Sequence, residues 1–252
     1  MMKYFSIQSS LDEKIMGKLP QLKEVIHKCN VSNDPNFINK FVFEKIKSRP
    51  ILSNAVLSTN SKQTDLIEAS GVGFSCGAML ISEKLKNLLA NSHCFGVQFF
   101  PTYIIHKNQR NENYWQTHIY NIPYNLLDLK KTNIYKKNAL TRSVDFKEKI
   151  EVSNTEDLLS KIKELEFPYC IFFKDVAFKD EMNLDYFFLR YFEGANQGIV
   201  SQRLKDKIEK QEITGIEFKP IEVSLNNWLG SGGVREKFYG NIVQMQSNGK
   251  SK

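Results

Sequence analysis

The residues that could do chemistry in this 252-residue chain are few and scattered. Gly71, Gly73 and Gly77 form a GxGxxxG pattern, which in a strand–helix unit can hold a dinucleotide phosphate at a helix N-terminus. The preceding segment TDLIEAS does not have the pattern of a buried strand, and no alternating series of strands and helices follows. We therefore interpret residues 71–77 as a glycine-rich connection. A nucleotide-binding enzyme that uses these glycines is the least favoured of three functions that we consider.

Other reactive residue types lack the spacing of a catalytic or metal site. Four carboxylates crowd the segment 175–185, but a solvated turn explains them better than a cation site or an acid/base pair. His27 lies two positions from Cys29 and His93 adjoins Cys94, yet the chain has no CxxC pair. It contains neither GxSxG nor HExxH, and its final NGKS lacks the first glycine of a phosphate loop. We expect no catalytic residue, no cofactor and no metal ion.

The composition is that of a folded globular protein. Apolar residues make up 41% and charged residues 25%, which excludes disordered and fibrous classes, and the net charge is +7. The longest apolar-rich run, around residues 95–105, is shorter than the roughly 20 residues of a membrane span. The first 15 residues lack the apolar stretch of a secretory signal, and four widely spaced cysteines form no disulfide framework. We expect no membrane segment, free thiols and a cytoplasmic location.

An internal repeat is the most informative feature of the sequence. Segment 81–101 aligns without a gap on segment 200–220, at a constant offset of 119 positions. Conservative pairs accompany the identities, which exceed the roughly one match expected by chance. The identical pairs are Ser82/Ser201, Leu85/Leu204, Lys86/Lys205, Gly96/Gly215, Phe99/Phe218 and Pro101/Pro220.

Both copies of the repeat predict a capped helix that leads into a strand. The serine is a suitable N-cap because its hydroxyl accepts a hydrogen bond from the first turn. Leucines and isoleucines three or four positions apart then form one buried stripe. The glycine permits a left-handed turn, and the alternation of VQFFP or IEFKP is typical of a strand. We interpret the repeated residues as determinants of the fold and not as a binding or catalytic site.

The remaining segments predict further strands and helices. Strand 97–105 should meet 114–122 across the eight-residue loop HKNQRNEN, and 167–174 should flank a polar stretch with 184–192 in the same manner. Asn154 resembles the start of a capping box ahead of a helix at 155–165. Two further helices are expected near residues 10–17 and 20–28.

These elements predict an α+β fold with a mixed, mostly antiparallel sheet, in which two related helix–strand halves pack as one globule. Residues 1–60 would form an N-terminal extension of the globule, 61–150 the first half and 151–225 the second half. Residues 226–252 would form a flexible C-terminal tail, with GSGG as a hinge.

Aromatic residues interleaved with lysines make the best case for nucleic-acid contact. Stacking rings beside a cationic track would bind a single strand. No known nucleic-acid-binding motif accompanies them, so we favour a partner-binding or merely soluble face and keep a nucleic-acid-binding regulatory protein as the alternative. The residues concerned are Tyr114, Trp115, Tyr120, Tyr124, Lys130, Lys131, Tyr135, Lys136 and Lys137.

An ordered set of these motifs resembles a known family over roughly residues 65–222. The family is that of bacterial polymorphic-toxin immunity proteins of the MXAN-0049 type, a domain of unknown function (sixteen twenty-nine). Its helix start of the form (V/I)SERL, a following strand with a glycine and a proline, and a later acidic residue all have matches here. The matching residues are Ser82, Glu83, Leu85, Gly96, Phe99, Pro101, Tyr114, Trp115, Asp128, Ser201, Leu204, Thr214, Gly215 and Phe218.

The resemblance implies a non-enzymatic cytoplasmic protein that neutralises a cognate toxin protein by direct stoichiometric binding. It transfers no catalytic residues. We expect the toxin-facing surface to include the 106–113 loop with its neighbours, or the region around the second tryptophan, because Trp, Tyr and Arg are favoured interface anchors. The candidate anchors are Trp115, Tyr114, Arg110 and Trp228. The basic balance predicts a neutral or acidic contact face on the toxin, and the oligomeric state is left open.

Overall fold

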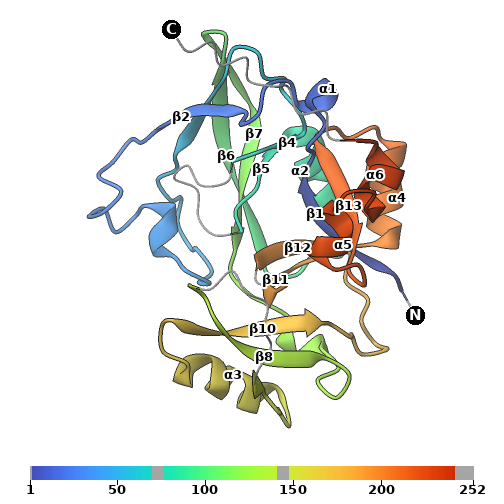
Figure 1. Cartoon of the computed structure of the whole chain (residues 1–252). Coiled ribbons are helices and arrows are strands. Elements are labelled where there is room, and N and C mark those ends of the chain that lie inside the picture. The colour runs from blue at the N-terminus through green and yellow to red at the C-terminus, as the bar shows by residue number, and fades with distance from the viewer. Residues whose placement is uncertain (1, 70–76, 141–147, 194, 242–252) are drawn as a thin grey trace, which may run out of the picture.

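The computed structural model describes residues 2–69, 77–140, 148–193 and 195–241. They form two sheets in one globule (Figure 1). In spatial order, the seven-stranded sheet contains β13 (Ile216–Pro220), β1 (Tyr4–Ser9), β12 (Ala195–Ser201), β11 (Tyr186–Phe192), β10 (Tyr169–Asp175), β8 (Asn133–Asn138) and β9 (Glu148–Lys149). The six-stranded sheet contains β2 (Leu22–Ile26), β3 (Asn54–Leu57), β6 (Val97–His106), β7 (Gln109–Ile119), β5 (Leu80–Ser82) and β4 (Leu66–Ile67).

Most strand pairs are antiparallel, and β10–β11 and β3–β6 are parallel. The mixed, mostly antiparallel α+β class predicted from the sequence is therefore confirmed. The α-helices are α1 (Glu13–Met16), α2 (Glu83–Ala90), α3 (Thr155–Glu164), α4 (Gln202–Lys210), α5 (Leu225–Leu229) and α6 (Val234–Tyr239). Short 3-10 turns occupy Ile38–Lys40 and Tyr124–Leu126.

Both copies of the repeat fold as a strand, a capped helix and a second strand. Ser82 Oγ accepts a hydrogen bond from Leu85 N at 3.2 Å, and Ser201 Oγ accepts one from Leu204 N at 3.1 Å. The hydroxyl thereby pairs an amide that the first helical turn leaves without a partner. The units β5–α2–β6 and β12–α4–β13 thus have the local structure that the sequence predicts.

The two units also have the same strand neighbours, although one neighbour comes from the far end of the chain. In the first half, β7 lies between β6 and β5, and Trp115 is opposite both Pro101 and Ile81. In the second half, β1 lies between β13 and β12, and Phe5 is opposite both Pro220 and Val200. The N-terminal strand therefore takes the place that a hairpin partner takes in the first half. The domain boundaries at residues 60, 150 and 225 stay a prediction.

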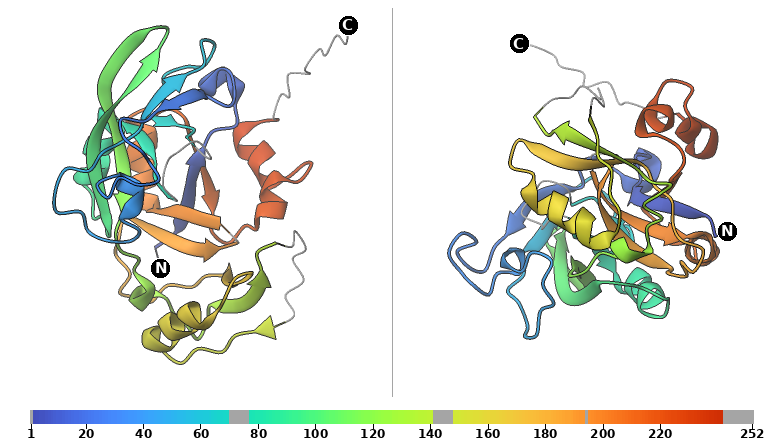
Figure 2. Two further views of the ribbon diagram at one scale, coloured as in Figure 1. Left: turned by 90° about the vertical axis from the view of Figure 1, so that its left-hand side faces the viewer. Right: turned by 90° about the horizontal axis from the view of Figure 1, so that it is seen from below.

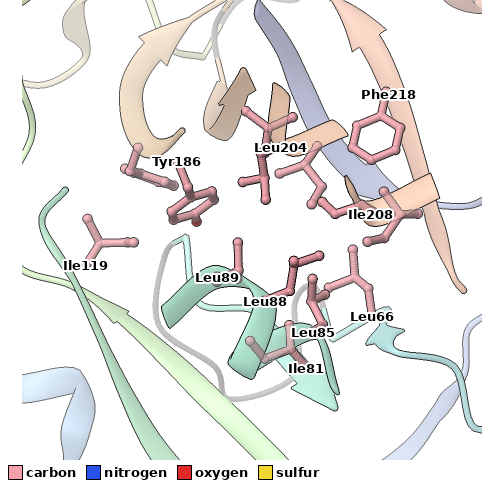
Figure 3. Packing of buried hydrophobic residues seen from close by; sticks show 14 residues of the cluster. Leu66, Ile81, Leu85, Leu88, Leu89, Ile119, Tyr186, Leu204, Ile208 and Phe218 are labelled. Atoms are coloured by element: carbon pink, nitrogen blue, oxygen red, sulfur yellow. The ribbon is translucent and has the colours of Figure 1, made fainter. Parts of the chain in front are cut away.

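The helices α2 and α4 pack against each other in the core between the halves. Leu85, Leu88 and Leu89 of α2 face Leu204 and Ile208 of α4 (Figure 3). All five side chains are buried. Burial of a leucine or isoleucine side chain stabilises the folded state by about 1.5–3 kcal/mol, so this seam is a major source of stability. A second core lies under α3, which covers the β8–β10 end of the molecule (Figure 2).

Two aspartates join the halves in a reciprocal way. Asp65, ahead of β4, accepts hydrogen bonds from Ser82 Oγ at 2.5 Å and from Thr214 N of the other half at 2.8 Å. Asp185, ahead of β11, accepts them from Ser201 Oγ at 2.7 Å and from His93 N of the other half at 3.1 Å. Each carboxylate therefore fixes its own helix start and the turn that follows the opposite helix.

Three local expectations were wrong. Residues 22–26, expected in a helix, form β2 because Leu22 and Val25 pair with Leu57 and Ala55 of β3. The expected eight-residue hairpin loop is a two-residue turn, because polar residues continue both strands beyond the core. Segments β10 and β11 do not form a hairpin: β10 pairs antiparallel with β8 and meets β11 in parallel at Phe173 and Phe192.

The expected flexible tail is folded as far as the structure describes it. Helices α5 and α6 cover residues 225–229 and 234–239, and they lie together beside the seven-stranded sheet (Figure 2). Trp228 and Arg235 are both buried. The prediction of a flexible tail rested on the polar, glycine-rich composition, which does not indicate these long-range contacts. Helix α3, by contrast, begins as predicted, with Asn154 Oδ1 accepting from Asp157 N at 2.9 Å.

Candidate partner-binding groove at the extended hairpin

The two halves diverge immediately after the last repeated residue. Beyond Pro101, β6 continues to His106, and β7 returns from Gln109 through a turn at Lys107 and Asn108. Both turn residues have positive φ, 52° and 62°, as a tight two-residue hairpin turn requires. Beyond Pro220, the second half turns away into α5 instead. The hairpin extension is therefore a feature of the first half alone, where its Ile104 pairs with β3 and is buried.

The extension forms one wall of a groove of about 350 Å³. Strand β6 pairs with β3 at Ile104 and Ile105, and the groove lies on the N-terminal side of this pairing in both segments. Thr102 Oγ1 bonds to Asn54 Oδ1 at 3.1 Å and thereby connects the two walls. The groove is lined by Lys28, Arg49, Pro50, Ile51, Leu52, Asn54, Pro101, Thr102, Tyr103, Arg110 and Glu112.

Tyr103 organises two of the cations that line this hairpin groove. The guanidinium carbon of Arg110 lies 3.9 Å from the centre of the Tyr103 ring, and Lys28 Nζ lies 5.0 Å from it. A cation over an aromatic face gains about 0.5–1 kcal/mol at an exposed site. Arg110 Nη2 also contacts Glu112 Oε1 at 3.0 Å, and both side chains are more than half exposed. The ring therefore holds exposed positive charge in a defined place.

Positive charge predominates in the groove. Lys28, Arg49 and Arg110 are cationic, and Glu112 is the one carboxylate among the lining residues. Within the described part of the chain, no ion pair involves Arg49 or Lys28. An anionic partner would therefore gain attraction without first displacing an internal salt bridge at either residue.

The four anchors proposed from the sequence do not lie on one surface. Arg110 lines the hairpin groove, whereas Tyr114 is 4% exposed and its Oη donates to Thr64 O at 2.9 Å. Burial, with a smaller effect of the Asp65 charge, raises the pKa of Tyr114. Trp115 is half-buried against the α2–α4 core, with Lys86 Nζ 4.6 Å from its ring centre.

Trp228 is fully buried and packs against Tyr239, with ring centres 6.1 Å apart. Its side chain is therefore part of the interior and not a surface anchor in this structure. Of the four residues, Arg110 has the placement that a partner contact requires, and Trp115 offers only part of its ring.

Three residues that line the groove were not predicted as partner-binding residues from the sequence. Lys28, Arg49 and Tyr103 are 21 and 54 positions apart, and no local motif connects them. Only the fold, which brings the segment before β3 beside β6, places them around one hollow. The single local signal was the run of polar residues from His106 to Asn113, which pointed to an exposed hairpin end.

The aromatic and basic residues proposed for nucleic-acid contact are distributed over both sheets. Trp115 lies on β7 of one sheet, and Lys136 lies on β8 of the other. Lys131 pairs with Asp128 at 3.0 Å, and Lys136 pairs with Glu148 at 3.2 Å. Internal carboxylates therefore neutralise part of this charge, and the described residues form no continuous cationic track.

The other candidate sites from the sequence are described by the structure only in part. Most of the GxGxxxG stretch, residues 71–76, lies outside the described residues. Across the described ranges, no group of three or more His, Cys, Asp or Glu residues gathers in a way that could hold a metal ion. Among the carboxylates of 175–185, Asp185 is buried and joins the two halves. A search of the described helices finds none that is long and apolar enough to span a membrane.

The comparison with protein families identifies the class of protein. The model of the immunity protein family Imm11 matches residues 4–223, which include both halves and the hairpin groove. The chain therefore belongs to this family of immunity proteins. The match ends just before α5, so the two C-terminal helices lie beyond it. No curated protein matches the chain.

Proposed function

We propose that this immunity protein neutralises a cognate bacterial toxin in the cytoplasm by binding it stoichiometrically, without catalysis. The family match over residues 4–223 is the observation that carries the proposal. The structural roles of four polar residues support the proposal. Asp65, Asp185 and the two capping serines stabilise the scaffold and are placed within the fold, not around a reactive cleft.

The hairpin groove is the surface that best fits such a role. A stable protein complex buries about 800 Å² on each partner and depends on a few anchors, among which Arg and Tyr are enriched. Arg110 lies over the ring of Tyr103, and both residues line the hollow on an extension that the second copy of the repeat lacks. We propose this groove and the adjoining hairpin as the toxin contact. Within the immunity proteins, the motifs shared with the MXAN-0049 type support that finer assignment.

Co-expression with a candidate toxin, sought among the genes adjacent to that of this chain, tests the proposal. We expect the chain to restore growth and to copurify with the toxin. Because Arg110→Ala with Tyr103→Ala removes the stacked pair, this double variant should weaken the complex at least tenfold. Lys210→Ala is the matched control, since it removes an exposed charge on α4 that does not line the groove. Growth rescue without any complex would contradict neutralisation by binding.

A further inference from the structure

We infer that the hairpin groove recognises carboxylate groups, presented by an acidic surface segment of the toxin. This inference rests on the proposed function and specifies the chemistry of the toxin's contact face. Three cations, Lys28, Arg49 and Arg110, line the hollow against one carboxylate. An acidic segment is the complement of that charge, and opposite potentials across an interface favour association and fix its register.

The pair formed by Arg110 and Glu112 shows how such a group would bind. Glu112 Oε1 lies 3.0 Å from Arg110 Nη2, so a carboxylate already forms an ion pair with this guanidinium. A guanidinium presents five N–H donors in a fixed fork, and a single contact leaves most of them available. Stacking on Tyr103 restricts the rotation of Arg110, which lowers the entropy lost when a partner carboxylate is bound.

The walls of the groove favour a protein segment over a nucleic acid. Single-stranded nucleic acid binds to successive aromatic rings, each of which stacks on a base. Tyr103 is the one aromatic residue among the lining residues, and Arg110 and Lys28 lie over its ring. The remaining apolar lining, Pro50, Ile51, Leu52 and Pro101, suits the aliphatic stems and backbone of an extended peptide.

Titration of the isotope-labelled full chain with hexaglutamate tests the groove chemistry without the toxin. In low salt, we expect NMR signals of Tyr103, Arg49 and Arg110 to shift with hexaglutamate and not with hexalysine. Arg49→Ala with Arg110→Ala should weaken this binding at least tenfold, whereas Lys210→Ala should leave it unchanged. Because Glu112 competes for Arg110, Glu112→Gln should strengthen binding. Absence of selective shifts at the groove, or tighter binding of a twelve-nucleotide oligo-dT to the same signals, would overturn the inference.

Affinity measurements on the toxin complex test this inference separately from the proposed function. If the wild-type chain forms no complex with the toxin, the proposed function is wrong, regardless of whether hexaglutamate binds to the groove. If the complex forms and Arg49→Ala with Arg110→Ala leaves its affinity and salt dependence unchanged, the function stands and the carboxylate inference is wrong. We expect the double variant to weaken the complex and to reduce the dependence of its affinity on salt.

Discussion

At the residue scale, Gly96 and Gly215 show why the repeat retains particular residues. Their φ angles are +68° and +84°, in the region that side chains with a Cβ rarely adopt. A Cβ at either position would also meet backbone atoms, of Asn121 at Gly96 and of Leu66 at Gly215. Their carbonyls accept from equivalent partners, Tyr120 N after β7 and Ser10 N after β1. The two glycines therefore have matching surroundings.

Gly215→Ala should destabilise the protein for two reasons. The same substitution at a second glycine distinguishes between them. The positive φ alone costs about 1–2 kcal/mol for a residue with a Cβ, and the contact with Leu66 adds to this. Gly232 has a φ of +67° but open space around it, so Gly232→Ala should show only the first cost. Urea unfolding measures both variants. Equal losses would show that close packing at Gly215 is unimportant.

The ionisation of Asp185 should make the stability of the folded protein depend on pH. Burial by itself would raise the pKa of this carboxyl, but hydrogen bonds from Arg203, Ser201 and His93 outweigh it and lower the pKa. A pKa lower in the folded than in the unfolded state stabilises the protein above the unfolded value near 4. This contribution is lost as the pH falls through the folded-state value.

Asp185→Asn should therefore lower the free energy of unfolding at pH 7 by about 2–4 kcal/mol, since charged hydrogen bonds at a buried site are lost. It should also flatten the decline in stability below pH 4. Asp206→Asn, at an exposed position of α4, is the control. Chemical unfolding at pH 7 and below pH 4 makes the comparison, and an unchanged acid profile in Asp185→Asn would refute the assignment.

At the scale of elements, the C-terminal helices are attached to β13 by buried charges. Arg235 donates to both carboxylate oxygens of Glu217, at 2.6 and 2.7 Å, and both side chains are almost fully buried. Lys219 pairs with Glu193 at 2.6 Å in the same region. In addition, Phe218 N donates to Tyr239 Oη at 2.8 Å, so α6 also covers the outer edge of β13.

Arg235→Ala should cost about 3–5 kcal/mol of stability, because it leaves the Glu217 carboxylate buried without its cationic partner. Lys237→Ala, an exposed position on the same helix, should cost under 0.5 kcal/mol. The double variant Glu217→Gln with Arg235→Met should recover part of the loss, since no charge is then left unpaired. Thermal unfolding compares the three. A mild effect of Arg235→Ala would restore the expectation of a flexible tail.

Elements were predictable where their determinants are local. Ser82, Ser201 and Asn154 each lie within three residues of the amides that they cap, so helix starts could be found from spacing. The strand at 22–26 and the helices after 224 depend on partners such as Leu57 and Glu217, which are distant in sequence. No local pattern reports such partners, and these elements were missed.

At the scale of the whole molecule, the halves should unfold together. Asp65 and Asp185 each bind both halves, and β1 inserts the N-terminus into the second. Trp115 and Trp228 report on different regions, so Trp115→Phe and Trp228→Phe give two single-tryptophan proteins. In each, the fluorescence midpoint in urea should equal the circular dichroism midpoint of the same protein, as two-state unfolding requires. Separate midpoints would show independent halves.

The hairpin groove could be predicted only in part from the sequence. Arg110 was identified because it lies in an exposed polar hairpin, which is a local property. Trp228 was proposed as an anchor from residue type alone, but it is buried and packs against Phe238 and Tyr239 of α6. Lys28 and Arg49 come to line one groove with Tyr103 only through the pairing of β3 with β6. Residue type therefore identified a candidate anchor, whereas topology determined which candidates share a surface.

Titration of the toxin's activity with this chain is the most direct test of neutralisation by binding. Inhibition should rise linearly and reach completion at a fixed molar ratio of chain to toxin. The chain should then be recoverable unaltered from the complex, and the toxin should regain activity after separation. Complete inactivation by a small fraction of an equivalent of chain, with the toxin left permanently altered, would contradict the account and indicate a catalyst.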